Sequence, residues 1–241
     1  MVDFVATANL HILKTNGNGV SDKVTFNLKH EMTRIDLKAK VNENVYGSTA
    51  ANRTKVVIRS IKLKSGGEFY TKADYRFFQP MLSSERGIWD NRTTATTDLD
   101  LQSILNWSTD WAISGKDIIS STNQGIALEG TSEVDLFNTN QYLFLIPALN
   151  ETGLTANSTS ATITYDIITE DSNLEDGYSK TSAIKTVYLP EGIMQQGKAY
   201  NLTFKIAVDQ VKLDATVAGW ETDTNSGIDV PYTPDNATVN P

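Results

Sequence analysis

Residues 197–220 carry an apolar side chain at nearly every second position, which is the period of a β-strand. The apolar positions are Tyr200, Leu202, Phe204, Ile206 and Val208 in the first half and Val211, Leu213, Ala215 and Val217 in the second. The alternation slips by one residue at Asp209 and Gln210. One continuous strand of this length would reach roughly 70 Å at about 3.3 Å per residue, which is too long for a compact domain. The slip therefore predicts a bulge or a turn, and the segment is interpreted as two core strands in series.

The two-residue period recurs along the rest of the chain. Residues 23–41 show it twice, and a kink is expected where the apolar face changes, at Thr33 and Arg34. Further strands are expected where β-branched and aromatic residues alternate, at residues 2–13, 56–63, 142–146, 161–168 and 184–189. Residues 91–97 and 152–160 are rich in Asn, Ser and Thr and are expected to form surface loops.

Helix is scarce in this sequence, and residues 98–111 are its best candidate. Asp98 is placed to cap the start of such a helix. A rough apolar stripe consists of Leu101, Ile104, Leu105 and Trp111. The Thr- and Ser-rich flanks indicate one or two turns inside a loop insertion. The expected fold class is therefore an all-β sandwich with long loop insertions and little helix.

Composition excludes several classes of protein. With 241 residues, 39% of them hydrophobic, the chain can bury a substantial core. No run approaches the roughly 18 apolar residues of a transmembrane helix. The formal charge of −8 argues against a nucleic-acid partner, because phosphates attract clusters of Lys and Arg. The absence of cysteine excludes disulfides, thiolate catalysis and thiolate metal sites.

The chain offers little catalytic or metal-binding chemistry, so no catalytic residue, metal ligand or cofactor is expected. Its two histidines, His11 and His30, are few for a His-based site, and His30 is expected to be a hydrogen-bonded core residue on the apolar face of a strand. The DSNLEDG segment at residues 171–177 alternates acidic residues like a calcium loop. It has Asp176 where Gly is needed and Ser182 where Glu is needed, so it is interpreted as a solvated acidic turn.

Two other kinds of function remain open from the residues alone. Trp89, Trp107 and Trp111 lie in the long segment between strands, where exposed indoles could stack on a sugar ring. Burial of these tryptophans in the core is the alternative. The 29 acidic residues could also include the carboxylate pair of a glycosidase, although the sequence singles out no pair. A carbohydrate-binding surface module is thus the second hypothesis, and an enzyme is the third.

Segments spread along the chain follow a recognisable order. They are VDFVATA (2–8), FNLKHEMTRIDLKAKV (26–41), YLFLIPAL (142–149), TVYLPEGIMQQGKAYNLTFKI (186–206) and VKLDATVAGWET (211–222). Together they resemble the motifs of the Bacteroidales fimbrillin-like family, whose members are type V pilin subunits. The resemblance covers most of the chain from Val2 to Trp220. The chain departs from the family pattern at Met194, where the family often has Trp.

The resemblance implies a structural, non-enzymatic subunit of a fimbrium on the surface of a Gram-negative bacterium, and this is the first hypothesis. It implies transthyretin-like, Greek-key β-sandwich domains. It also implies polymerisation with other pilin subunits by donor-strand complementation, in which an extended segment of one subunit fills a groove in the next. Adhesion to a glycan or protein on a host or bacterial surface would follow from such a role.

The same resemblance implies that the chain is the carboxy-terminal portion of a longer lipoprotein precursor. The first residues lack the basic stretch and apolar run of a signal peptide, and contact with the outer membrane would come only through a lipid anchor outside this chain. Residues 1–225 are expected to form the β-sandwich module, with residues 1–20 as the remnant of a preceding domain in a two-lobed arrangement. Residues 226–241 are expected to form an extended tail.

The tail contains a candidate donor strand. Ile228, Val230 and Tyr232 lie at alternate positions, which is the spacing that lets side chains enter the pockets of a receiving sheet edge. Pro231 has no backbone N–H, so it would have to face away from that edge. An inert, solvated terminus is the alternative.

Overall fold

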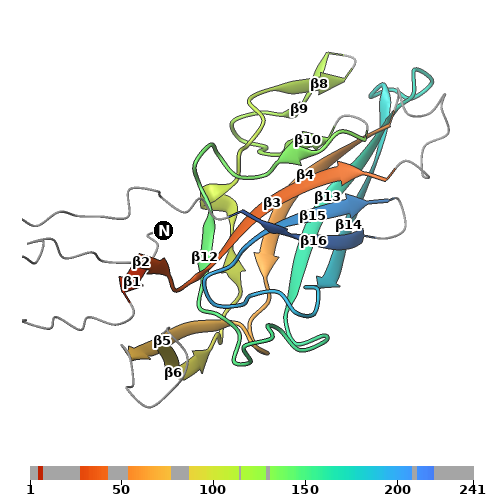
Figure 1. The fold of residues 1–241 in the computed structure, drawn as a ribbon. Helices are drawn as coiled ribbons and strands as arrows, with labels where there is room; N and C mark the ends of the chain where they lie inside the picture. The colour runs from red at the N-terminus through yellow and green to blue at the C-terminus, as the bar shows by residue number, and fades with distance from the viewer. Residues whose placement is uncertain are drawn as a thin grey trace, which may run out of the picture.

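The computed structural model of the chain is built from strands and turns (Figure 1). The residues that the structure describes are 5–7, 28–42, 54–76, 87–113, 115–128, 131–207 and 211–219. Within these residues the only helical element is the 3-10 turn η2 (Gln102–Ile104). The predicted donor residues Ile228, Val230 and Tyr232, together with His11, lie outside the described residues.

Two sheets pack against each other (Figure 1). The first sheet contains, in spatial order, β10 (Ile126–Leu128), β4 (Thr54–Leu63), β13 (Ser160–Glu170) and β14 (Tyr178–Tyr188), and β7 (Leu99–Asp100) also pairs with β4. The second sheet contains β11 (Val134–Asp135), β3 (Thr33–Val41), β15 (Ala199–Ile206) and β16 (Val211–Ala218), and β12 (Leu143–Leu145) also pairs with β3. Every pair is antiparallel except β15 with β3, which is parallel.

The hydrophobic core lies between the two sheets and is produced by the two-residue alternation of their strands. The second sheet contributes Ile35, Leu37, Ala39 and Val41 of β3 and Tyr200, Leu202, Phe204 and Ile206 of β15. The first sheet contributes Val56, Ile58, Ile61 and Leu63 of β4 and Ala161, Ile163 and Tyr165 of β13. These strands lie where the alternation predicted them, and the expected all-β sandwich is confirmed.

Three two-stranded units complete the described fold. β1 (Val5–Thr7) pairs with β2 (Leu28–His30), β5 (Tyr70–Arg76) pairs with β6 (Ile88–Thr94), and β8 (Trp111–Ile113) pairs with β9 (Lys116–Ile119). The β8–β9 hairpin covers the outer face of the first sheet. A second, smaller core forms there from Val57, Ile113, Ile118, Ile119 and Ile168. The long insertion between β7 and β10 is therefore folded onto the sandwich.

Residues 98–111 contain the single 3-10 turn η2 and no α-helix, which agrees with the expected one or two turns inside a loop insertion. Leu101 and Leu105 are buried, as the apolar stripe requires, but they lie on either side of the short η2 turn and not on one helical face. Neighbouring strands supply the backbone partners of this segment: the Leu101 N–H donates to the Ile61 carbonyl at 3.1 Å, and Leu105 forms an isolated bridge with Phe137. Tertiary pairing thus replaces the hydrogen bonds that a helix would have made.

Several boundaries also differ from the prediction. Residues 91–94 belong to β6 and not to a loop, because β5 pairs with this strand. The break between β2 and β3 lies at Glu31 and Met32, directly before the predicted kink. β16 forms the edge of its sheet, so it is less buried than a core strand, and its Val217 is 70% exposed.

Candidate assembly surface

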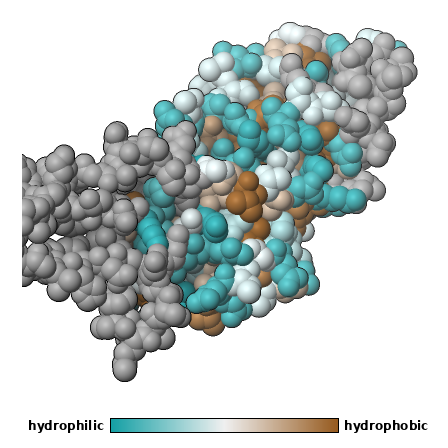
Figure 2. Space-filling view, viewed as in Figure 1, coloured by the Kyte–Doolittle hydropathy of each residue, from teal (hydrophilic) through white to brown (hydrophobic). Residues whose placement is uncertain are grey.

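Each sheet ends in a strand with one paired neighbour in the described part of the chain. These edge strands are β14 and β16, and they lie next to each other along one side of the sandwich (Figure 1). Ile184 and Tyr188 of β14 and Val217 of β16 are 69%, 57% and 70% exposed. Figure 2 shows a few hydrophobic residues set in a mostly hydrophilic face. Because a free strand edge offers unpaired N–H and C=O groups, these two edges are the candidate surface for assembly.

A β-bulge in β4 turns Arg59 onto the outer face of the first sheet. β13 pairs Tyr165 with Ile58 and Thr164 with Ser60, so Arg59 is the extra residue and has no partner on β13. Arg59 is not among the residues predicted from the sequence, although a signal was present. Two consecutive polar residues, Arg59 and Ser60, stand between two isoleucines where strict alternation allows only one.

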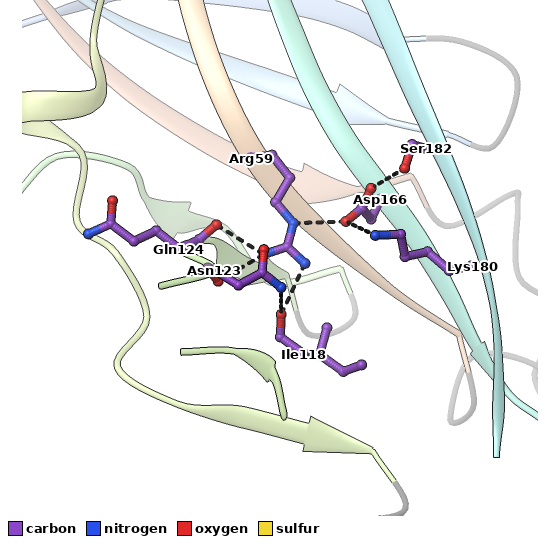
Figure 3. Close-up of polar contacts among 7 residues, drawn as sticks. All are labelled: Arg59, Ile118, Asn123, Gln124, Asp166, Lys180 and Ser182. Atoms are coloured by element: carbon purple, nitrogen blue, oxygen red, sulfur yellow. Dashed lines mark hydrogen bonds and ion pairs between the residues drawn. The ribbon is translucent and has the colours of Figure 1, made fainter. Parts of the chain in front are cut away.

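The Arg59 guanidinium joins the first sheet to the loop between β9 and β10 (Figure 3). Its Nε donates to Asp166 Oδ2 at 2.8 Å. Its two terminal nitrogens donate to the backbone carbonyls of Ile118, Asn123 and Gln124 at 3.1, 3.1 and 2.9 Å. A single side chain therefore donates to two loop carbonyls, one carbonyl of β9 and one carboxylate.

Asp166 is the buried anion of this network, and its side chain is 5% exposed. It accepts a hydrogen bond from Ser182 Oγ at 2.6 Å and lies 3.5 Å from Lys180 Nζ (Figure 3). Burial alone would raise the pKa of the Asp166 carboxyl, but the hydrogen bond from Ser182 and the contacts with Arg59 outweigh burial and hold this pKa below its ordinary range. A carboxyl held ionised in this way suits an anchor and not a general acid.

The lowered pKa of Asp166 predicts an acid-dependent part of the stability. Such a group stabilises the fold above its unfolded pKa of about 3.9, and the stabilisation is lost as the pH falls through the folded pKa. We expect the difference in free energy of unfolding between the unmodified chain and Asp166→Asn to be constant from about pH 7 to 5 and to shrink below about pH 4. Urea unfolding over this range measures the difference. A difference that stays unchanged at about pH 3 would contradict the lowered pKa.

Gly125 allows the loop to approach Arg59. A Cβ at this position would lie 2.5 Å from Val57 Cγ1 and 2.8 Å from Arg59 Nη1. We therefore expect Gly125→Ala to displace the guanidinium and to lower the free energy of unfolding by about 1 to 3 kcal/mol, as overpacking does. Gly219→Ala is the matched control, because a Cβ there meets nothing within 4 Å. Equal urea midpoints for the two variants would contradict this role of Gly125.

A second buried polar cluster lies at the break between β2 and β3. Glu31 is 1% exposed, and its Oε2 accepts a hydrogen bond from Gln196 Nε2. The same Gln196 nitrogen donates to the Gly87 carbonyl at 2.9 Å, and Trp89 Nε1 donates to the Glu31 carbonyl at 2.9 Å. The cluster therefore joins the start of β3, the β6 strand and the segment before β15.

The three tryptophans considered for glycan stacking pack against different parts of the fold. Trp89 is 8% exposed and meets Tyr75 edge to face, with ring centroids 5.0 Å apart. Trp107 is half-buried against the main core and donates through Nε1 to the Gln102 carbonyl at 3.1 Å. Trp111 is half-buried against the smaller core beside the β8–β9 hairpin. Glycan stacking by these residues stays a prediction.

The described residues hold neither a metal-binding cluster nor a membrane-spanning helix. No group of three or more His, Asp and Glu side chains is arranged there to hold a metal ion. None of the helical structure in that part is long and apolar enough to cross a membrane. His30 is half-buried at the end of β2. The DSNLEDG segment at residues 171–177 joins β13 to β14. Its residues 172–176 are exposed, as a solvated turn requires.

Comparison with known proteins identifies relatives of the chain. Fimbrium subunit Fim1C of Phocaeicola vulgatus is 28% identical to it over 239 residues, which cover 95% of this chain and 58% of that protein. The chain is therefore similar to a fimbrium subunit. A solved fimbrial protein from Bacteroides vulgatus has the same fold, with a TM-score of 0.64 and 23% identity over 81% of this chain and 56% of that one. No family profile matches the sequence. The chain thus spans little more than half the length of each of these proteins.

Proposed function

We propose that this fimbrillin-like chain is part of a structural subunit of a cell-surface fimbrium and has no catalytic role. The observation that carries the proposal is the match to a fimbrium subunit over 95% of the chain. The fold supports it, because the described residues form a sandwich whose polar networks hold elements together. Its partners are other pilin subunits, its location is the outer surface of the cell, and adhesion to a surface glycan or protein is its biological role.

Assembly proceeds by strand complementation, in which the tail of one subunit adds a strand to a sheet of the next. Burial of Ile228, Val230 and Tyr232 at roughly 1.5 to 3 kcal/mol each would contribute about 5 to 9 kcal/mol. Association costs about 4 to 15 kcal/mol in lost freedom, so these anchors alone do not hold a fibre. Backbone hydrogen bonds along the added strand, at about 1 kcal/mol each, supply the remainder. Among the described residues β14 and β16 each have one paired neighbour, and their outer edges offer the groups that such a strand needs.

Sedimentation velocity of the full chain, and of its longer precursor after processing at the amino end, tests this function. We expect polymers for the unmodified chain and for Thr238→Asp, a tail change outside the alternating residues. Val230→Asp is expected to remain monomeric, because its carboxylate would be buried beside the receiving edge. Monomer alone for every sample at high concentration would overturn the structural role. Assembly of Val230→Asp into polymers would support the fimbrial role but contradict the proposal that the tail is the donor.

A further inference from the structure

We propose that the outer face of the first sheet, beside Tyr188, is a binding site for a neutral oligosaccharide. This site deepens the proposed function, on which its role in adhesion rests, because it names the class of surface glycan that the subunit binds. Its location follows from the strand register and from the exposure of Tyr188, and the class of ligand follows from the balance of charge around it.

The pairing register places Tyr188 on the outer face of the first sheet. Ala161 of β13 and Val187 of β14 are directly paired core residues. The next pair along the strands, Ser160 with Tyr188, therefore points away from the core, because successive side chains of a strand alternate between its faces. Tyr188 is 57% exposed and is the only exposed aromatic residue in the described part of the chain. It offers a flat apolar ring with a hydroxyl at its edge.

A row of polar side chains continues from Tyr188 across the outer face. Ser160 follows Tyr188 on the neighbouring strand, and the Lys64 N–H donates to the Ser160 carbonyl at 2.9 Å, so Lys64 is next. The row ends at Asp98, whose Oδ2 accepts a hydrogen bond from Lys64 Nζ at 2.7 Å. An aromatic ring, a hydroxyl, an ammonium and a carboxylate thus follow one another across the sheet.

A second row lies directly beside the first, two residues further along the strands. Its members are Thr186, Thr162, Lys62 and Asp100. The hydroxyls of Thr162 and Thr186 are 3.0 Å apart, and Lys62 Nζ lies 3.1 Å from Asp100 Oδ2. Both rows therefore combine hydroxyls with one lysine–aspartate pair.

A chain of sugar rings fits this arrangement of groups. The C–H face of a sugar ring packs on an aromatic ring such as Tyr188, while the hydroxyls at its rim need both donors and acceptors. The first row provides Lys64 as a donor, Asp98 as an acceptor and Ser160 as either. From Tyr188 to Asp98 it crosses three strand spacings of about 4.8 Å each, roughly 14 Å, which is long enough for more than one linked ring.

The charge balance of this face favours a neutral glycan. Lys62 and Lys64 are paired with Asp100 and Asp98, so the two rows carry no net charge. The hydrogen bond from Lys64 lowers the pKa of the Asp98 carboxyl to about 2, so this group accepts hydrogen bonds at neutral pH. The formal charge of −8 on the whole chain repels a polyanion. Neutral hydroxyls, which both donate and accept, complement the paired charges better than sulfate or carboxylate groups do.

Tyr188 is better placed for stacking than the three tryptophans. Trp89 is buried, and Trp107 and Trp111 are half-buried against the two cores. The β8–β9 hairpin packs on the same outer face as Tyr188, but its contacts lie further along the strands, around Ile168. The end of the face that contains Tyr188 is therefore the open one.

Isothermal titration calorimetry of the full chain tests the site with hexasaccharides of glucose, mannose, galactose and N-acetylglucosamine. We expect at least one of them to bind with a Kd of roughly 1 mM, because an open face makes few contacts with a ligand. Many copies in a fibre would multiply this weak binding. Polygalacturonate, an anionic polymer, is expected not to bind.

Variants of the two ends of the first row locate the binding. Tyr188→Ala is expected to raise the Kd about ten-fold or more, whereas Tyr188→Trp keeps an aromatic ring and is expected to bind like the unmodified chain. Lys64→Gln is expected to raise the Kd about three-fold or more. Lys205→Gln is its matched control, because Lys205 is paired with Asp214 on the outer face of the second sheet and should leave the Kd unchanged.

Failure of this site and failure of the proposed function give different results. An unchanged Kd for Tyr188→Ala, equal Kd values for Lys64→Gln and Lys205→Gln, or no binding of any of the four hexasaccharides would overturn the site. Polymers in sedimentation velocity would still support the fimbrial role in each of these cases. Hexasaccharide binding that is lost in Tyr188→Ala, by a chain that stays monomeric under all conditions, would support the site and contradict the fimbrial role.

Discussion

Replacing Arg59 with alanine is expected to lower the free energy of unfolding by about 3 to 5 kcal/mol, as the loss of one partner from a buried ion pair does. The change leaves Asp166 buried with Ser182 and a Lys180 ammonium 3.5 Å away. It also removes the guanidinium that donates to the Asn123 and Gln124 carbonyls, so the loop between β9 and β10 loses these two contacts with β4. The Ile118 carbonyl of β9 keeps its hydrogen bond from Asn123 Nδ2 at 2.7 Å. Urea unfolding gives the free energy, and hydrogen exchange shows whether the hairpin loosens first.

Two controls separate the ion pair from the bulge that positions it. Ser60→Ala alters the neighbouring bulge residue without removing a charge and is expected to change the free energy of unfolding by about 0.5 kcal/mol or less. The double change Arg59→Met with Asp166→Leu removes both charges and is expected to be less destabilising than Arg59→Ala alone. A loss below about 1 kcal/mol for Arg59→Ala would contradict the anchoring role of this network.

Replacing Phe204 with alanine is expected to lower the free energy of unfolding by about 3 to 5 kcal/mol. Phe204 is 1% exposed at the centre of β15, where it pairs with Ala39 of β3 on one side and Leu213 of β16 on the other. Its side chain belongs to the core between the two sheets, so truncation would create a cavity there. Urea unfolding measures this loss as a lower midpoint with an unchanged m value, the slope of the free energy of unfolding against urea concentration.

The matched controls lie at the same position and next to it. Phe204→Leu keeps most of the volume and is expected to lose about 1 kcal/mol. Thr203→Ala, on the outer face of β15, is expected to change the free energy of unfolding by about 0.5 kcal/mol or less. Equal losses for Thr203→Ala and Phe204→Ala would contradict the assignment of the inner face.

The central strands could be predicted because each buries one face continuously. In β3 and β15 every second residue is apolar and buried, so the period of the pattern specifies both the strand and its inner face. Val217 shows the limit of this argument. Its spacing is the same as that of Phe204, but its strand has a single neighbour among the described residues, and a sequence pattern does not show which strand lies at an edge.

The polar network around Arg59 and the segment at residues 98–111 show what local sequence patterns miss. Arg59 and Asp166 are 107 residues apart in sequence, and only the pairing of β4 with β13 brings them together. The four-residue spacing of Leu101 and Leu105 is typical of a helix, but partners on other strands decide the structure of that segment. Both features depend on contacts between distant segments, which outweigh local propensity.

Electron cryo-microscopy of the assembled form would test most directly whether this chain works as a building block that shares strands with its neighbours. The account predicts a fibre in which each sandwich contains one extended strand from the adjacent copy, hydrogen-bonded to β14 or β16, the strands with one paired neighbour in the described part of the chain. A fibre whose copies touch only through side chains, with both β14 and β16 unpaired, would contradict it.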